Sequence, residues 1–368
     1  MKLLFMGLQA GNRSGTGRYS EALLDALGEL KKELELTVIW PRDLLPPTAA
    51  HDMVLYRRNP AGLSRMYTEQ WGVRRFRGMD IVHYPASIGP IIHPGYPTVI
   101  TVHDLSFLRH PEWFRKNRAW YYRHWVERSV RIADHIIADS HATAEDLVSL
   151  LNVPASQITV AHLGVTPHFR PASEDHIALV RETYNLPRNF FLYVGTLEPR
   201  KNIARLIRAW SMVAGEIPQD LVLAGRRGWK LQSVHQAWSR SPHRARIHFP
   251  GYIQQDHLPA LLCAADAFTW PSLFEGFGLP PLEAMACGTP VLTSNTSSLP
   301  EVVGDAALTV SPRDTQAMAK ALLQLSSDQQ LQAELREAGL ERAAQFSWKN
   351  TAKTVMDAYR KCLEDTAT

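Results

Sequence analysis

Short apolar runs alternate with helical patterns from one end of the chain to the other, and this alternation limits the fold more than any other feature. The runs are rich in β-branched and aromatic residues and are bounded by Pro, Gly or Asp, which is typical of buried strands. They form two series: residues 1–8, 36–40, 81–84, 98–102, 135–138 and 158–161, then 190–194, 221–224, 246–249, 267–270, 290–294 and 308–310. The pattern predicts an α/β fold with parallel sheets.

The interval between the two series predicts a domain boundary. With 368 residues the chain is longer than one ordinary core requires. Pro167, Pro171 and Pro187 interrupt regular structure there, around a charged helix near Ser173–Tyr184. We therefore expect an N-terminal domain over residues 1–170 and a C-terminal domain over 186–347. A last helix over about 348–364 is expected to pack back on the first domain.

Composition excludes several classes of protein. No apolar run reaches the roughly 18 residues that a membrane-spanning helix needs. Polar residues from Gln9 onward cut the first apolar run short, so we interpret it as a buried strand and not as a secretion signal. The three cysteines are far apart, which fits a reducing cytoplasm. The formal net charge of +4 favours anionic partners such as sugar nucleotides or acidic lipids, and we expect no nucleic acid.

The segment Gly195–Asn202 has the pattern of a strand end, a loop and a helix start. Gly195 permits close approach of a ligand, and Asn202 is predicted to cap the helix. Arg200 and Lys201 stand at a helix N-terminus, where the helix dipole disfavours cations. This placement indicates an anionic ligand such as a departing nucleoside diphosphate. The alternative is two solvated basic residues on an ordinary surface.

A second segment, Glu275-Gly-Phe-Gly-Leu-Pro-Pro-Leu-Glu283, also follows a strand and opens a helix. Gly276 and Gly278 allow a sharp turn that presents backbone amides, and prolines suit a first helical turn. Glu275 lies on the loop, whereas Glu283 belongs to the helix. Ionised carboxylates only accept hydrogen bonds and therefore bind the diols of sugars and ribose well. The alternative is a glycine-rich turn with two exposed acids.

The first half of the chain offers weaker candidates. Gly15 and Gly17 follow the first strand and could bring amides to an anion, although a lone G-x-G more often forms only a tight turn. His103 ends a predicted strand, at the sheet edge where open α/β folds bind ligands. The alternative is a core histidine paired with Asp104. We expect no metal site from these two residues, because further ligands are lacking at suitable spacing.

Together these segments resemble the retaining glycosyltransferase family 4. The segment Glu275–Glu283 resembles the family's E-x7-E signature, and Gly195–Asn202 its G-x-x-x-x-R/K-K-N block. Residues 221–225, 251–253 and 289–304 are similar to the strands and segments that accompany the signature. The resemblance implies the GT-B architecture, with two Rossmann-like doubly wound domains facing across a cleft.

The resemblance also implies roles for individual residues, and it implies a metal-independent reaction without a cofactor. Glu275 is expected to hold the donor sugar, Glu283 the ribose, and Arg200 and Lys201 the diphosphate. Thr196 departs from the arginine that many members carry after the first glycine. Further contacts with the donor are expected from Gly15, Gly17, His103, Gly195, Thr196, Tyr252, Ile253, Gly276, Phe277, Gly278 and Leu279.

The block from Val102 to Asp146 resembles bacterial mannosyl- and rhamnosyltransferases of surface polysaccharide assembly, such as O-antigen or exopolysaccharide. This implies a hexose donor, GDP-mannose or a related GDP-hexose, with a UDP-sugar as the alternative. The implied acceptor is a lipid-linked or growing glycan.

Aromatic and basic residues crowd residues 113–131, and further arginines lie between Arg57 and Arg77. Such a composition suits a lipid interface and predicts peripheral binding to an anionic membrane, at the cytoplasmic face of the inner membrane. The alternative is an amphipathic helix packed on the first sheet with its arginines in water.

Two other classes of protein compete with this interpretation. A nicotinamide oxidoreductase would also use Rossmann-like domains, but neither glycine loop reads G-x-G-x-x-G with an acid about 20 residues later. A non-catalytic partner subunit could bind a nucleotide sugar without turning it over. The joint presence of Glu275, Arg200, Lys201 and His103 favours an enzyme over such a subunit.

Overall fold

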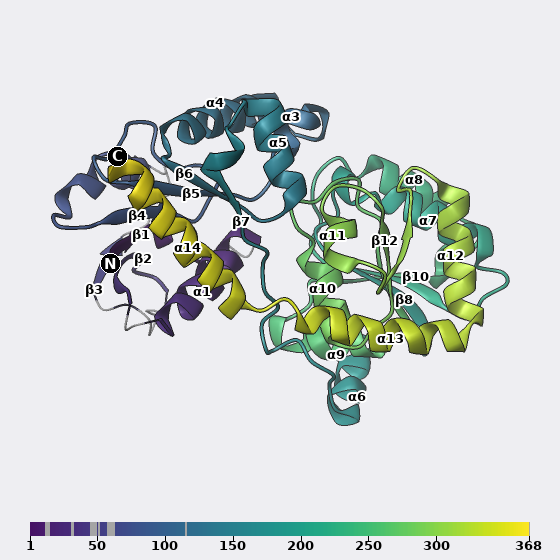
Figure 1. Cartoon of the computed structure of the whole chain (residues 1–368). Coiled ribbons are helices and arrows are strands. Elements are labelled where there is room, and N and C mark those ends of the chain that lie inside the picture. Colours follow the sequence, from purple (N-terminus) through teal and green to yellow (C-terminus); the bar gives the residue numbers. More distant parts are fainter. Residues whose placement is uncertain are drawn as a thin grey trace. The chain divides into compact units, whose positions relative to one another are not determined.

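The computed structural model describes residues 1–11, 15–30, 33–44, 50, 52–56, 63–114 and 116–367. The chain forms two compact units (Figure 1). The first comprises Met1–Gly164 together with Phe346–Thr368, and the second comprises Val165–Gln345. Both are α/β units, as the alternation of strands and helices in the sequence predicts.

The first unit is built on a seven-stranded parallel sheet of order β3-β2-β1-β4-β5-β6-β7. Its strands are β1 (Lys2–Phe5), β2 (Glu35–Pro41), β3 (Asp52–Tyr56), β4 (Ile81–Tyr84), β5 (Thr98–Val102), β6 (His135–Ala138) and β7 (Ile158–Val160). Strands β4, β5 and β6 are buried along their whole length, as expected for a sheet covered on both faces. Strand β3 was not predicted: it lies at the sheet edge, with Met53 and Val54 exposed.

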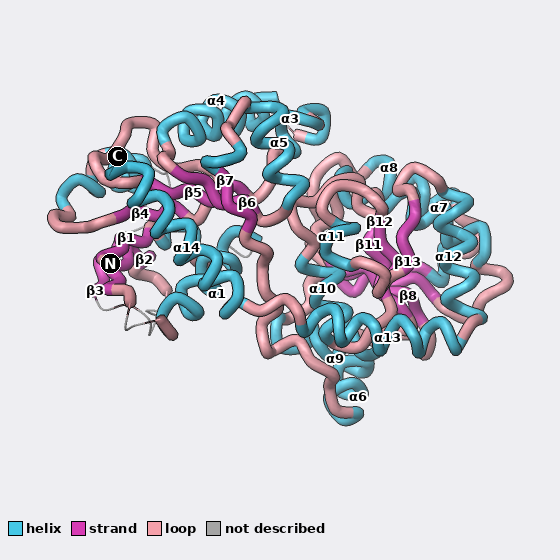
Figure 2. The backbone as a smooth tube through the Cα atoms, viewed as in Figure 1, coloured by secondary structure: helices cyan, strands magenta, loops and turns pink. Residues whose placement is uncertain are grey.

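The helices of the first unit lie around this sheet (Figure 2). They are α1 (Gly15–Gly28), α2 (Leu63–Gln70), α3 (Ser106–Arg109), α4 (Lys116–Ile132), α5 (His141–Leu151) and α14 (Trp348–Ala367). The last helix comes from the far end of the chain and contacts α1, β5, β6 and β7. The hydroxyl of Tyr359 on α14 lies 2.6 Å from Nδ1 of the buried His83 on β4. The hydroxyl of Thr351 donates to the carbonyl of His162 at 2.7 Å. The C-terminal helix is therefore part of the first unit's core.

The second unit contains a six-stranded parallel sheet of order β10-β9-β8-β11-β12-β13. Its strands are β8 (Phe190–Val194), β9 (Asp220–Ala224), β10 (Ile247–Gly251), β11 (Ala267–Trp270), β12 (Val291–Ser294) and β13 (Leu308–Val310). Its helices are α6 (Glu174–Thr183), α7 (Ile203–Val213), α8 (Gln232–Arg240), α9 (Leu258–Ala264), α10 (Leu279–Ala286), α11 (Leu299–Val303), α12 (Thr315–Ser327) and α13 (Gln329–Ala344). Each of the six strands coincides with a predicted run to within two residues.

Both sheets reverse their strand order at one point. In the second unit the chain proceeds outward from β8 to β10 and then returns to place β11 on the other side of β8. In the first unit the same reversal separates β1 from β4. The loops after such neighbouring strands diverge, and the crevice between them is where doubly wound folds bind ligands. The loops after β8 and β11 carry the two sequence segments of greatest interest.

Among the described residues, none of the helices is both long and apolar enough to cross a membrane.

Candidate functional site

A buried carboxylate and two cations meet at the strand-order reversal of the second unit. Glu275 lies on the loop after β11, while Arg200 and Lys201 lie in a short 3₁₀ turn after the neighbouring strand β8. Lys201 Nζ donates to Glu275 Oε1 at 2.6 Å, and Arg200 Nη1 donates to Oε2 at 3.1 Å. The structure therefore brings Glu275 together with two cations that precede it by 75 and 74 positions in the sequence.

Two further residues complete this cluster. Trp270 Nε1 donates to Glu275 Oε1 at 3.1 Å, and Lys201 Nζ lies 4.4 Å from the centroid of the Trp270 ring. Glu198 accepts from Arg200 Nε at 3.3 Å. The cluster thus contains two carboxylates, Glu198 and Glu275, and two cations, Arg200 and Lys201. The two cations are therefore not placed unfavourably at the helix start, contrary to the expectation, because carboxylates compensate both of them.

The pKa values of the cluster follow from this pairing. Burial disfavours the charged carboxylate of Glu275, but Arg200 and Lys201 outweigh it, so the pKa of Glu275 lies below its ordinary value. Burial and the adjacent Arg200 lower the pKa of Lys201, against the opposing effect of Glu275. Glu275 is therefore an ionised, hydrogen-bond-accepting group at neutral pH.

Gly195 is required by the protein's own packing. Gly225, with φ of +129°, follows the adjacent strand, and a Cβ atom added there would lie 2.0 Å from the carbonyl oxygen of Gly195. A Cβ atom at Gly195 would itself lie 2.7 Å from the Tyr193 hydroxyl. The amide of Gly225 donates to the carbonyl of Gly251 at 2.7 Å. The ends of β8, β9 and β10 therefore touch through bare backbone, which fixes the loop that carries Thr196.

Asn202 stands at the N-cap position of α7, as predicted, but its side chain makes no capping hydrogen bond. The residue adopts a left-handed conformation with φ of 60°. Its side-chain nitrogen Nδ2 donates to the backbone carbonyls of Pro271 at 3.0 Å and Pro312 at 2.7 Å. Asn202 thereby joins the loop after β8 to the loop after β11. This long-range role holds the cations of one loop beside the carboxylate of the other.

Glu275 and Glu283 are both buried, with 7% and 4% of their surface exposed, which excludes the alternative of two exposed acids. Glu283 lies inside α10, whereas Gly276 and Phe277 lie on the preceding loop and Leu279 is the first helical residue. Gly278, with φ of +126°, stands at the N-cap position of this helix.

Two serines, which sequence reasoning missed, hold this loop in place. Ser298 Oγ donates to the carbonyl oxygens of Glu275 at 3.0 Å and Phe277 at 2.6 Å. The amide of Glu275 donates to Ser297 Oγ at 2.9 Å. The signature loop is thus fixed by the segment after β12. Two serines in a loop give no sequence pattern from which their role in holding the Glu275 loop could have been predicted.

The end of β10 places an aromatic surface beside the same sheet edge. Tyr252 is 46% exposed, and the guanidinium carbon of Arg226 lies 4.7 Å from its ring centroid. The next residue, Ile253, is buried. This flat, partly cationic surface is suited to stacking with a planar ligand group.

In the first unit His103 follows β5, and its partner is not Asp104, the partner that the alternative interpretation gave it. His103 Nδ1 lies 2.7 Å from Oδ2 of Asp139, which follows the neighbouring strand β6. Asp104 instead accepts from the amide of Ser106 at 2.9 Å and from its hydroxyl at 2.6 Å. Asp139 was missed because 36 residues separate it from His103, and only strand pairing brings them together.

Gly15 and Gly17 lie in the first turn of α1. Gly17 is buried, and no atom lies within 4 Å of a Cβ atom added at Gly15. Arg13, between these residues and β1, lies outside the described residues. Packing therefore does not require a glycine at position 15.

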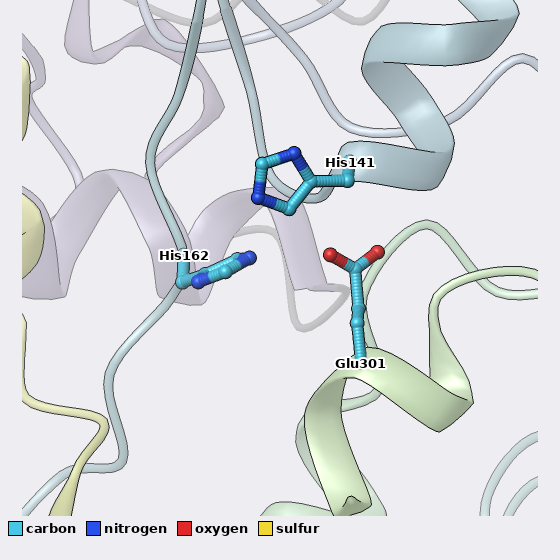
Figure 3. A group of neighbouring side chains, drawn as sticks. All are labelled: His141, His162 and Glu301. Atoms are coloured by element: carbon cyan, nitrogen blue, oxygen red, sulfur yellow. The ribbon is translucent and has the colours of Figure 1, made fainter.

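The carboxyl edge of the first sheet carries further histidines. His141 begins α5 and His162 follows β7, and their ring centroids lie 5.5 Å apart in an edge-to-face arrangement. Figure 3 shows the rings of both histidines. Ionisable side chains thus follow three adjacent strands, β5, β6 and β7, of the first sheet.

Known proteins resemble the chain in sequence and in structure. The family described as Glycosyltransferase Family 4 matches residues 13–169, and that described as Glycosyl transferases group 1 matches residues 180–342. The chain is 36% identical over 295 residues to the O-antigen chain mannosyltransferase B of Escherichia coli, covering 79% of this chain and 77% of that protein.

It is 34% identical over 278 residues to the serotype-specific mannosyltransferase WbdA of Escherichia coli. That match covers 73% of this chain but only 34% of WbdA, so the chain spans about a third of that relative. In structure it resembles sucrose-phosphate synthase from Thermosynechococcus elongatus, with a TM-score of 0.77, 20% identity and full coverage of both chains. This structural similarity establishes the arrangement of strands and helices.

Proposed function

The chain belongs to family 4 of the glycosyltransferases and has the GT-B fold, and from this premise we propose that it transfers mannose from GDP-mannose to a growing glycan in the assembly of a surface polysaccharide. Transfer of a sugar follows from the family. The choice of mannose is supported by the relative at 36% identity, which is an O-antigen mannosyltransferase. A related GDP-hexose fits the same reasoning, and a UDP-sugar is the alternative donor.

The observation that carries the proposal is the ionised Glu275 held between Arg200 and Lys201. Oε1 accepts from both Lys201 and Trp270, whereas Oε2 accepts from Arg200. A carboxylate has about four acceptor positions, so Oε2 retains capacity to accept from a sugar hydroxyl. We therefore assign Glu275 to the donor sugar, next to the amides of Gly276–Leu279.

Arg200 and Lys201 have a second role in this scheme. As the bond to the sugar breaks, negative charge grows on the departing diphosphate, and fixed cations stabilise that charge more than they stabilise the intact donor. Because both cations are already in place, the reaction as proposed needs no metal ion. Addition of a chelator should leave the rate unchanged.

The remaining predicted residues complete the donor site as we propose it. Glu283 binds the ribose, and Tyr252 and Ile253 lie against the base. In the first unit His103 contacts the donor sugar. We propose that the main-chain groups of Gly15, Gly17, Gly195 and Thr196 contact the phosphates of the donor.

A donor panel tests the proposal. The purified protein is incubated with GDP-mannose, other GDP-hexoses and UDP-hexoses, with and without a glycan acceptor, and nucleotide release and melting temperature are measured. We expect stabilisation and turnover with GDP-mannose. Turnover with UDP-sugars alone would identify the alternative donor. Tight binding without turnover on any acceptor would instead indicate a non-catalytic partner subunit.

Helix α4 supports a proposal about the acceptor. Val126 and Val130 pack into the core of the first unit, so part of the amphipathic alternative is correct. Yet Trp120 is 66% exposed and Tyr121 is 44% exposed, next to an exposed Arg123. Exposed aromatic rings beside cations suit the interface of an anionic membrane. We therefore place the acceptor on a lipid at the cytoplasmic face of the inner membrane.

Flotation with vesicles tests this placement. Wild-type protein should float with vesicles that contain anionic lipid and should do so less at high salt, because salt screens surface charge. The double variant Trp120→Ser with Tyr121→Ser should bind several-fold less, whereas Leu179→Ser, at an exposed apolar residue of α6, should bind like wild type. The placement would be contradicted if binding did not depend on anionic lipid and if the Trp120→Ser, Tyr121→Ser double variant bound like wild type.

A further inference from the structure

His103 faces a hydrogen-bond acceptor at each ring nitrogen. Nδ1 lies 2.7 Å from the carboxylate of Asp139, and Nε2 lies 3.4 Å from the carbonyl oxygen of Pro85. Carboxylate and carbonyl oxygens only accept hydrogen bonds, so both contacts are satisfied together only when both nitrogens carry hydrogen. That form of the ring is the imidazolium cation. The geometry therefore favours a charged His103.

The buried carboxylate of Asp139 is the group that the positive charge of His103 would compensate. Only 3% of Asp139 is exposed, and its Oδ1 is buried without a hydrogen-bond partner among the described residues. A buried carboxylate that stays ionised needs a paired positive charge. The ring of His103 is the group that bonds to its other oxygen.

The other ionisable groups around the ring do not supply this charge. Tyr19 on α1 packs edge-on against His103, with centroids 4.9 Å apart, and burial raises the pKa of its hydroxyl far above the working range. Burial lowers the pKa of His83 on β4 to about 3, so that ring is neutral. Asp104, which accepts from Ser106, is an acid, and its charge favours the cationic ring in the same direction as Asp139. Burial alone would lower the pKa of His103, and chiefly Asp139 reverses this, so that it is raised.

Buried hydrogen bonds hold Tyr19, whose ring packs against that of His103. The Tyr19 hydroxyl lies 3.0 Å from Thr101 Oγ1, which in turn lies 2.8 Å from His83 Nε2. His83 Nδ1 contacts Tyr359 on α14. A chain of buried hydrogen bonds from the C-terminal helix thus holds the ring that packs against His103.

We propose that Asp139 is a positioning residue for glycosyl transfer, which holds Nδ1 of His103 so that the ring is a cation and presents Nε2–H to an oxygen of the nucleotide sugar. This proposal rests on the function proposed above. The present contact of Nε2 with Pro85 is long, so an oxygen of the donor can replace it. His103 would then place one positive charge beside the donor.

The variant Asp139→Asn tests the proposal, because asparagine keeps the shape and can still accept from Nδ1 but carries no charge. The pKa of His103 is measured by NMR of ¹⁵N-histidine-labelled protein and assigned with His103→Gln. We expect it to fall by about one unit or more, with the alkaline limb of kcat/KM moving down equally. Activity would then stay within about threefold of wild type at pH 6 and fall about tenfold at pH 8.5.

Two controls separate positioning from simple stability. In a His103→Gln background, Asp139→Asn should have no further effect on kcat/KM. Asp146→Asn removes another buried acid of the first unit, paired with Arg109, and should leave the pKa of His103 unchanged. An unchanged pKa in Asp139→Asn, or an equal loss at every pH, would overturn the proposal. The NMR titration uses no donor, so it would still report the pKa shift if the proposed sugar were wrong.

Discussion

Glu275 shows how one residue joins stability to function. Its carboxylate compensates the buried Lys201 and the half-buried Arg200, and removing it would take away the acceptor that both cations share. Breaking a buried ion pair from one side costs about 3–5 kcal/mol, because the remaining charge has lost its partner. A variant at this position will therefore lose stability as well as activity. A simple loss of transfer in Glu275→Ala cannot be assigned to donor binding unless folding is measured too.

We predict that Glu275→Gln lowers the melting temperature and that adding Lys201→Met restores part of the loss, because the second change removes the stranded charge. The depressed pKa of Glu275 sets the sign of the pH dependence. Its stabilisation is complete above the unfolded-state pKa of about 4.3 and is lost as pH falls through the lower folded value. The difference in melting temperature between wild type and Glu275→Gln should therefore shrink from pH 6 to pH 3. A constant difference would contradict this account.

At the scale of elements, the sequence allowed twelve of the thirteen strands to be predicted among the described residues, because buried parallel strands read as continuous apolar runs. Strand β3 was not predicted because it is an edge strand with exposed side chains. Contacts between elements were harder to predict. The Asn202 bonds and the Asp139 partner depend on which strands are neighbours, and local pattern carries no information about that.

The contact between the ends of β8 and β9 gives a prediction at this scale. Gly225→Ala should lower the melting temperature strongly, since its Cβ would overlap the Gly195 carbonyl in a conformation that favours glycine. Gly15→Ala is the matched control, because nothing lies within 4 Å of the added atom and alanine is the better helix former. Its melting temperature should equal or exceed that of wild type. Equal stability of the two variants would show that the glycine contact is unimportant.

At the scale of the whole molecule, the two units carry different parts of the proposed chemistry. The second unit holds Glu275, Arg200 and Lys201, which the family signature in the sequence selected as candidates. The first unit holds His103 and the exposed aromatic face of α4. Here the sequence indicated candidate residues but not their partners. The C-terminal helix belongs to the first unit, so the chain's last segment supports the ring that packs against His103.

The central claim is that Glu275 and its two cations bind and activate a nucleotide sugar. The most direct test is the rate of GDP release from GDP-mannose in the presence of a glycan acceptor, measured for wild type and for Glu275→Gln at a temperature where both are folded. The account predicts turnover by wild type and a loss of about a hundredfold or more in the variant, the size expected when a group that contacts the reacting sugar is removed. Wild-type rates in a folded Glu275→Gln protein would contradict it.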